Sequence, residues 1–411
     1  MAPPPKGAKA DEATIAWVRD RFRRHYETTE FELPPRFARR EFGFMFWEAG
    51  MMQRHQSFKS GEALRDFLTR RTPMHVYFSS AYYEKPGAPT MEEKEWLGAD
   101  LVFDLDADHI ERVKGMPYEA MLEEVKSEII KIVDQYLTAD FGIGEESILI
   151  TFSGGRGYHI HVRDPRVWEL HSHERREIVD YITGTELDSD GLFRKVPLEL
   201  KKFQDRATVK YRYAMPRPED PGWPGRLSRG ITTAAERLES MPKEDALQEL
   251  ARTEGIGGKV AGEIYEALFS RHGGGRGIDK LRRGDIDIFS SDRLVDAFRR
   301  IFVPPALDLG KRETDEPVTS DIKRLIRMPH SLHGKTGLAV IPMTREALES
   351  FLPLRDAVPK AWTAEPTKVS LRAGIKVTMR DETFNLKEGM NIVPEHLAIF
   401  LACRGVASIA S

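Results

Sequence analysis

The chain has 411 residues, of which 40% are apolar and 31% are charged, and its formal net charge is −3. This length predicts more than one domain, and the composition is that of an ordinary globular protein. The charge excludes a protein that is basic throughout, so any contact with nucleic acid has to come from local patches. Because Cys403 is the single cysteine, an internal disulfide and a cysteine-rich zinc site are also excluded.

The N-terminal sequence, MAPPPKGAKADEA, lacks the apolar core of a signal peptide. No run of apolar residues approaches the length of a membrane span. We therefore expect a cytoplasmic protein that has no membrane partner.

Residues 12–27 place apolar side chains at helical spacing and predict the first helix. The stretch that follows, FELPPRFARREFGFMFW, interleaves Arg36, Arg39 and Arg40 with aromatic residues. Charge combined with stacking can bind nucleic acid. We favour the simpler interpretation, the edge of a core whose arginines lie in solvent.

Residues 101–109, LVFDLDADH, predict a buried strand that carries two acids. Side chains alternate along a strand, so Asp104 and Asp106 share one face while Phe103 and Leu105 share the other. Two carboxylates on one face repel each other and are costly to bury without a cation or a donor. The alternative is an ordinary strand end whose acids form turns or salt bridges.

A helix is predicted over residues 121–137, followed by strands at 147–152 and 158–162. The turn between the strands, SGGRG, contains Gly154, Gly155 and Gly157. The backbone amides of such a turn can approach an anion closely, and Arg156 adds positive charge. In the strand that follows the turn, His159 and His161 occupy alternate positions and therefore point to the same face of the sheet. Without further context, the same pattern fits a hairpin with two satisfied histidines. The mixture of strands and helices predicts an α+β fold.

From about residue 165 to 300 the sequence favours charged helices, which we interpret as a helical insertion. Within it, LARTEGIGGKVAGEIYEAL (250–268) resembles a helix-hairpin-helix, a module that binds DNA phosphates through backbone amides. The alternative interpretation is two short helices joined by a glycine turn near Gly255–Ala261.

The segment DEPVTSDIKRLIRMPHSLHGKTG (315–337) begins a basic stretch. Residues 321–345 include five Lys and Arg residues and one acidic residue, so the local net charge is +4. The GKT sequence is not a phosphate loop of an NTPase, because Pro329 replaces the required glycine and no strand leads into it. The stretch remains a candidate for binding a triphosphate or nucleic acid.

Together, two strand carboxylates, a Gly/Arg/His turn, a distant acid and a basic stretch are the components of metal-dependent nucleotidyl transfer. Cationic side chains and amides can hold the triphosphate. Carboxylates suit Mg²⁺ or Mn²⁺, which prefer oxygen ligands. From the residues alone, the third acid is Asp308, Asp315 or Asp321.

The chain resembles the catalytic small subunit of the archaeal and eukaryotic DNA primase. Three segments match in the family's order: YFSSAYYEKP…KEWLGADLVFDLDADH, FSGGRGYHIHV and PVTSDIKRLIRMPHSLHGKTG. The resemblance is dense over residues 74–182 and 301–345, and poor in the helical insertion. It implies a mixed-sheet primase-type core with the catalytic part split into residues 1–182 and 301–411 around an insertion at 183–300.

The resemblance implies specific roles for residues of all three segments. The metal ligands and catalytic acids would be Asp104, Asp106 and Asp315, the last selected because the family's acid lies just before the P-V-T segment. The incoming nucleotide would be bound by Ser153, Arg156 and His159, with Arg327, His333 and Lys335 on its other side.

Two departures from the family are visible. Gly155 stands where many relatives have a second arginine, so one triphosphate contact is expected to be missing or relocated. Relatives also often have a Cys/His zinc knuckle after the acidic pair, whereas this chain has His109 and no cysteine there, so we predict no structural zinc.

The resemblance further implies template-directed primer synthesis on single-stranded DNA from nucleoside triphosphates, in a heterodimer with a primase large subunit. Two alternatives are a stand-alone primase-polymerase of end-joining repair and a non-catalytic nucleic-acid-binding subunit. The intact set of acids disfavours the second alternative, because a subunit that only binds has no need of a metal triad.

Overall fold

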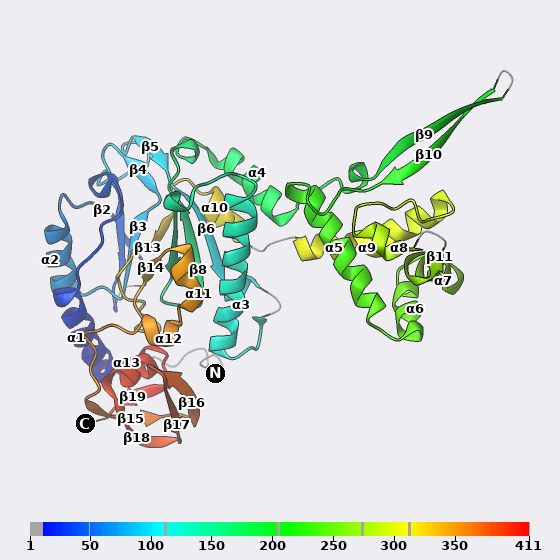
Figure 1. Cartoon of the computed structure of the whole chain (residues 1–411). Coiled ribbons are helices and arrows are strands. Elements are labelled where there is room, and N and C mark those ends of the chain that lie inside the picture. Colours follow the sequence, from blue (N-terminus) through cyan, green and yellow to red (C-terminus); the bar gives the residue numbers. More distant parts are fainter. Residues whose placement is uncertain are drawn as a thin grey trace. The chain divides into compact units, whose positions relative to one another are not determined.

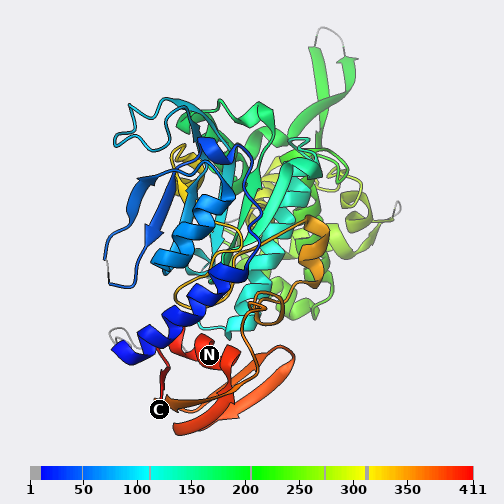
Figure 2. The same cartoon turned by 90° about the vertical axis from the view of Figure 1, so that its left-hand side faces the viewer.

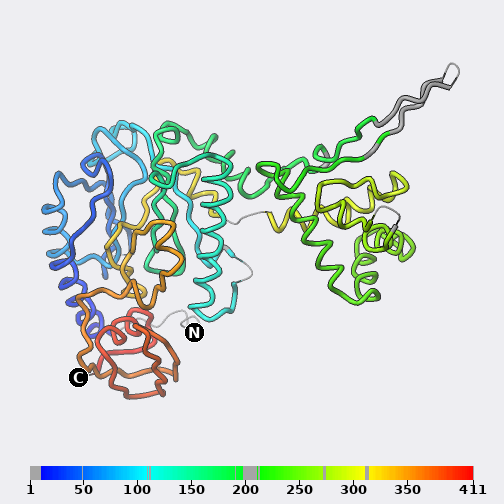
Figure 3. The backbone as a smooth tube through the Cα atoms, viewed as in Figure 1, coloured from blue at the N-terminus to red at the C-terminus, as the bar shows by residue number. Residues whose placement is uncertain are grey.

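The computed structural model describes residues 11–48, 50–110, 113–203, 206–272, 275–310 and 314–410. The chain divides into two compact units (Figures 1 and 3). The first unit comprises Met1–Asp134, Gly142–Val179 and Glu313–Ser411, and the second comprises Gln135–Phe141 and Asp180–Arg312. As functional domains, residues 1–182, 183–300 and 301–411 stay predictions.

The first unit is built on two four-stranded sheets (Figure 1). One has the order β13-β3-β1-β2, formed by Leu325–Arg327, His75–Ser79, Phe42–Met45 and Gln53–Gln56. The other has the order β14-β7-β8-β6, formed by Ile341–Met343, Ile148–Phe152, Gly157–Val162 and Leu101–Asp106. The α+β class is confirmed. The sequence favoured a mixed sheet, and every described pair of these two sheets is antiparallel; the tight turn 153–156 reverses the chain between β7 and β8.

The helix predicted over 121–137 is α3 (Tyr118–Lys131), continued by a π-helical segment, Ile132–Thr138. Its apolar stripe is buried as the periodicity predicts. The helix packs on β6 and β8. Phe103 and Leu105 are buried, while Asp104 and Asp106, at alternate positions of the same strand, keep partial exposure. Packing on one face of β6 therefore leaves the acids together on the other.

The N-terminal helix, α1 (Glu12–Thr28), packs against the C-terminal helix α13 (Glu395–Cys403), as Figure 2 shows. Its first turn is capped by Asp11, whose carboxylate accepts a hydrogen bond from the Thr14 amide at 2.7 Å. The buried carboxylate of Glu395 joins the two helices, because Arg21 and Arg24 donate to it at 3.2 and 2.7 Å. Two small sheets complete this end of the unit. They are β18-β15-β19 (Gly389–Pro394, Pro366–Leu371, Ala407–Ile409) and β16-β17 (Ile375–Met379, Glu382–Leu386).

The second unit has a helical core, as the sequence predicts for the insertion. Its principal helices are α5 (Gly222–Glu239), α6 (Lys243–Ala251), α7 (Gly258–Phe269), α8 (Gly277–Leu281) and α9 (Asp292–Gly310). It also contains a long hairpin that we did not expect, formed by β9 (Arg194–Phe203) and β10 (Arg206–Ala214). Alternating apolar residues in RKVPLELKKF have the period of a strand, but the density of charge favoured a helix. Among the helices described, none has both the length and the apolar character needed to cross a membrane.

His25 of α1 gives the fold a pH dependence. The imidazole is buried, and its Nε2 lies 2.9 Å from the carbonyl oxygen of His330. Burial lowers the pKa of His25 to about 4. The unfolded chain therefore binds a proton that the folded chain excludes, and stability is lost as pH falls below about 6.5.

We expect the free energy of unfolding of wild type, relative to that of His25→Gln, to fall by about 2 kcal/mol between pH 7 and pH 5. Urea unfolding of wild type and His25→Gln at both pH values measures this change. His173→Gln is the matched control, since the His173 side chain is 79% exposed. An equal gap between wild type and His25→Gln at the two pH values would contradict the prediction.

Candidate active site

The acidic pair lies where β6 meets β8. The antiparallel register places Asp104 opposite His159, and Asp106 opposite Gly157. The side chains of Asp104 and Asp106 are 22% and 34% exposed. His159 Nε2 lies 3.6 Å from Asp104 Oδ1, and an Arg156 guanidinium nitrogen lies 3.9 Å from Asp106 Oδ1. The pair is thus half-buried beside the glycine turn.

Burial raises the pKa of the Asp106 carboxyl group. The hydrogen bond from the Asp108 amide, at 3.0 Å, and the charge of Arg156 oppose this rise, whereas Asp108 and Asp104 add to it. The protein's own cations therefore do not offset the burial of negative charge at this point. A divalent cation between the acids would do so, and the donor set is the one that Mg²⁺ and Mn²⁺ prefer.

The backbone of Asp315 lies beside the pair. Its amide donates to the carbonyl oxygen of Asp104 at 3.1 Å, immediately before α10 (Glu316–Ser320). Of the other two acids left open by the sequence, Asp308 lies within α9 of the second unit and Asp321 follows α10. This contact favours Asp315 as the third acid, whose role stays a prediction.

Across the described ranges, no three His, Cys, Asp or Glu side chains are grouped closely enough to hold a metal ion by themselves. A cation bound by Asp104 and Asp106 would therefore need further ligands. These could be the Asp315 carboxylate, after rotation of its side chain, or phosphate and water oxygens. Mg²⁺ commonly binds in the latter way at nucleotide sites, through one or two carboxylates plus substrate phosphates.

The three glycines of the turn differ in how closely their surroundings approach. Gly154 has a φ of 75°, and a Cβ there would lie 2.7 Å from His333 Cβ. A Cβ on Gly157 would lie 2.2 Å from the Leu105 carbonyl oxygen and would push β8 away from β6. A Cβ on Gly155 would approach His333 Nε2 to 3.1 Å. The His333 ring therefore packs closely against the position that a side chain at residue 155 would take.

The remaining polar groups of the turn have local partners. Ser153 is buried, with its amide donating to the Gly157 carbonyl oxygen at 3.0 Å and its hydroxyl accepting from the Gly155 amide at 3.3 Å. The Arg156 side chain is 41% exposed and forms an ion pair with Asp108. Tyr118 of α3 donates to the Gly155 carbonyl oxygen. Hydrogen bonds within the turn and from Tyr118 of α3 therefore fix its backbone, while Arg156 keeps partial exposure to solvent.

The basic stretch contacts the same turn from the other side. Thr336 donates through its hydroxyl to the Gly154 carbonyl oxygen, and His333 lies over Gly155. Lys335 is exposed. Burial, together with the charges of Arg327 and Lys335, holds the pKa of His333 well below its usual range. The His333 imidazole is therefore neutral at physiological pH.

Arg327 ends β13 and lies beside Tyr77 of β3, with its guanidinium 4.6 Å from the centre of the Tyr77 ring. Burial lowers the pKa of Arg327, and the nearby carboxylates of Asp104 and Asp106 partly offset this. Arg327 is therefore close enough to the acidic pair for their charges to interact.

His75, for which the sequence predicts no role, positions Arg327. Its Nδ1 accepts from the Gly334 amide at 3.1 Å and contacts the Arg327 guanidinium. Burial, followed by the charges of Arg327 and Lys335, lowers the pKa of His75 to about 2, so the ring stays neutral and can accept. The local sequence could not reveal this role, because the partner strand β13 lies far away in the chain.

His159 is buried, and burial lowers its pKa to about 3, with the charge of Arg327 adding to the effect. Its Nδ1 has no hydrogen-bond partner among the residues that the structure describes. The contact with Asp104 is therefore made by a neutral ring. A neutral imidazole can orient the Asp104 carboxylate without neutralising its charge.

The sequence and its fold were compared with known proteins. The family model described as DNA primase small subunit matches residues 103–345. The DNA primase small subunits PriS of Methanothrix thermoacetophila and Methanocella arvoryzae are both 40% identical to this chain, over 96% and 97% of it and 99% of each relative. That of Halobacterium salinarum is 38% identical over 98% of this chain and 100% of the relative.

Among solved structures, the polymerase domain of Mycobacterium tuberculosis Ligase D in complex with DNA is similar to this chain. The alignment covers 85% of this chain and 88% of the Ligase D domain. The TM-score is 0.32 and the sequence identity is 14%.

Proposed function

Since the chain belongs to the DNA primase small-subunit family, we propose that the site at β6 and β8 synthesises primers on a single-stranded DNA template. The chain is a nucleotidyltransferase. In the proposed reaction a 3′-hydroxyl attacks the α-phosphate of an incoming nucleoside triphosphate and pyrophosphate leaves. The observation that supports this best is the β6–β8 register, which places Asp104 and Asp106 beside the glycine turn and His159.

The family depends on divalent cations, and we propose that Asp104 and Asp106, joined by Asp315, hold Mg²⁺ or Mn²⁺. When bound, such cations lower the pKa of the attacking hydroxyl and stabilise charge on the leaving oxygen. The raised pKa of Asp106 supports the assignment, since a nearby cation would favour its ionised form. The absence of a structural zinc stays a prediction.

The triphosphate is proposed to lie between the glycine turn and the basic stretch. Arg156 and Lys335 offer exposed positive charge there, and Arg327 adds a charge held in place by His75. Ser153 and His333 supply neutral polar groups beside the turn. His159, expected to contact the triphosphate, is nearly enclosed, and its contact with Asp104 supports an orienting role as well. Much of the catalysis would then be positioning.

Replacing Lys335 by methionine should raise the KM for the nucleoside triphosphate about tenfold or more, because a charged hydrogen bond to phosphate contributes about 1.5–3 kcal/mol. The kcat should change less, since Lys335 does not contact the acids in any described interaction. Steady-state extension of a primed template at varied nucleotide concentration measures both constants. The exposed Lys360 provides the control, Lys360→Met. Equal KM values in the two variants would remove Lys335 from the triphosphate site.

As a small subunit, the chain implies a partner subunit, and we propose a heterodimer with a primase large subunit that supports initiation. The relatives are named as primase subunits, which does not favour the end-joining alternative. A location in the cytoplasm stays a prediction.

The proposed function is tested by incorporation of labelled nucleotides on unprimed single-stranded DNA with Mg²⁺ or Mn²⁺. The chain is assayed alone and with its large subunit. We expect template-dependent products, with initiation increased by the large subunit. The absence of products in both cases, from folded protein that binds the template, would contradict primer synthesis.

A further inference from the structure

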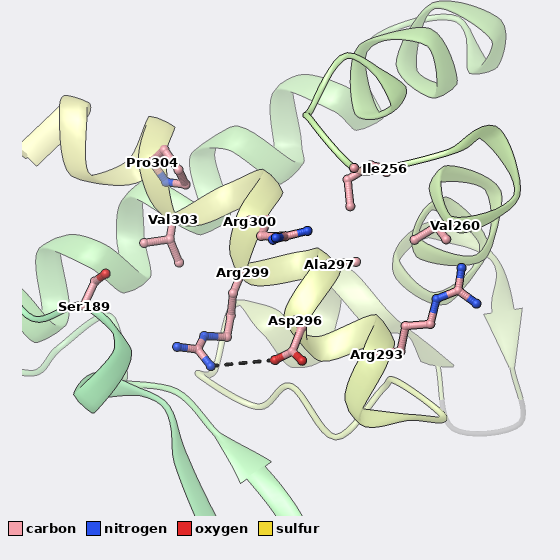
Figure 4. A pocket seen from close by; sticks show the side chains of 11 residues that line it. Ser189, Ile256, Val260, Arg293, Asp296, Ala297, Arg299, Arg300, Val303 and Pro304 are labelled. Atoms are coloured by element: carbon pink, nitrogen blue, oxygen red, sulfur yellow. Dashed lines mark ion pairs between the residues drawn. The ribbon is translucent and has the colours of Figure 1, made fainter.

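A cavity of about 690 Å³ lies in the second unit, between α9 and the segment that leads into α7 (Figure 4). Three arginines line it, Arg293, Arg299 and Arg300, against a single acid, Asp296. None of them belongs to the active site described above. The cavity therefore has an excess of positive charge whose purpose the active site does not explain.

Within the part of the chain that the structure describes, two of the three arginines have no ion-pair or hydrogen-bond partner. Arg299 lies 3.9 Å from Asp296 and stacks on Phe193. By contrast, the side chains of Arg293 and Arg300 form no ion pair or hydrogen bond with any residue of the described ranges. Figure 4 shows both extending from α9 toward α7 and the turn before it, whereas Arg299 extends toward Ser189. Two uncompensated guanidinium groups on a concave surface favour an anionic ligand.

The turn before α7 fits around Arg300. Gly255 has a φ of 78°, and Arg300 Nη1 lies 3.1 Å from the position that a Cβ at Gly255 would take. At Gly257 and Gly258, by contrast, a Cβ would meet nothing within 4 Å, so the chain backbone is uncovered there. Gly257 also provides no side-chain cap for α7. Backbone amides at the start of α7 can therefore add donors for phosphate oxygens.

The spacing of the arginines favours an extended ligand. Arg293 and Arg300 are seven residues apart on α9, or about 10.5 Å along the helix axis. Successive phosphates of one strand can reach both positions, whereas a single phosphate group cannot bridge such a separation easily. The other lining residues are mostly apolar and include Ile256 and Val260, which offer no groups for reading base edges.

We propose that this cavity binds the phosphate backbone of the single-stranded DNA template through Arg293 and Arg300, without regard to sequence. The proposal rests on the proposed function, because primer synthesis supplies the template. It assigns the helix-hairpin-helix-like segment near Gly255–Ala261 a role in binding the template to the second unit.

The test is binding of a fluorescein-labelled dT30 strand to the full chain, measured by anisotropy at several NaCl concentrations. Each phosphate contact contributes about 0.7 to the slope of log K against log[salt] for single strands. The double variant Arg293→Ala/Arg300→Ala should therefore lower the slope by about 1.4. If the variant and wild type bind dT30 equally at 1 M NaCl, the variant binds it about 25-fold more weakly at 0.1 M NaCl. Arg293→Lys/Arg300→Lys should retain most of the slope.

The matched control is Arg217→Ala/Arg283→Ala, which removes the same charge from two exposed arginines of the same unit outside the cavity. An equal loss in the control, or an unchanged slope in the Arg293/Arg300 variant, would overturn the proposal. So would a loss of ATP binding with dT30 binding intact, since the cavity would then hold free nucleotide.

Activity separates this proposal from the proposed function. At saturating primed template, the Arg293→Ala/Arg300→Ala variant should extend primers with the kcat of wild type and a raised KM for DNA. A lowered kcat with an unchanged KM would overturn the backbone site. If wild type made no product at all, the proposed function would fail while the salt slope of dT30 binding could still be read.

Discussion

Asp104→Asn should lower the kcat for primer extension by about 10³-fold or more while the protein stays folded. The substitution keeps the shape of a half-buried side chain but removes the charge on which a divalent cation depends. Cation-dependent stabilisation of the transition state contributes several kcal/mol, and each 1.36 kcal/mol is a factor of ten in rate. Single-turnover extension of a primed template measures the loss, and circular dichroism reports the fold.

The control for this loss is Asp66→Asn, which removes a carboxylate from the exposed face of α2 (Gly61–Arg71). It should leave extension unchanged. Asp106→Asn should match Asp104→Asn, because the two acids occupy alternate positions on the same strand. Extension by Asp104→Asn at the rate of wild type would rule out the metal assignment.

Arg40→Met should destabilise the first unit by about 3–5 kcal/mol, because it leaves the buried Asp100 carboxylate without its ion-pair partner. The side chains of Arg40 and Asp100 are fully buried, with an N–O distance of 2.7 Å. Arg40 also donates to the carbonyl oxygens of Pro35 at 2.9 Å and Ser79 at 2.6 Å. The guanidinium therefore joins three segments of the chain. Urea unfolding followed by tryptophan fluorescence measures the change.

The neighbouring arginine is a matched control. Arg39 pairs with Glu84 at 2.6 Å, but its side chain is 44% exposed. Exposed pairs contribute about 0–1 kcal/mol, so Arg39→Met should change stability little. The double variant Arg40→Met/Asp100→Leu should recover part of the loss, because it removes the unpaired charge as well. Similar unfolding curves for Arg39→Met and Arg40→Met would show that the buried pair has no special weight.

Local patterns in the sequence predicted the parts of the site that lie on one element. Alternation along residues 101–106 predicted that Asp104 and Asp106 share a face, and the apolar stripe of residues 121–137 predicted the buried helix. These features depend on the geometry of a single strand or helix. The glycine turn was also visible, because tight turns have a local composition.

Contacts between distant segments could not be predicted in the same way. Arg40 was expected in solvent and is instead buried against Asp100, because the sheet edge brings together residues 60 positions apart. His75 and Arg327 are separated by 252 residues and meet only because β13 pairs with β3. The choice of Asp315 likewise came from the family resemblance. Its contact with the Asp104 backbone depends on the tertiary fold.

The claim that Asp104, Asp106 and Asp315 act as one cation site is tested most directly by Mn²⁺ binding, followed by electron paramagnetic resonance in the presence of a nucleoside triphosphate. Wild type is compared with Asp104→Asn, Asp315→Asn and the control Asp321→Asn. We predict that the first two substitutions weaken Mn²⁺ binding strongly and that Asp321→Asn leaves it at the level of wild type. Unchanged binding in Asp104→Asn and Asp315→Asn would contradict the claim.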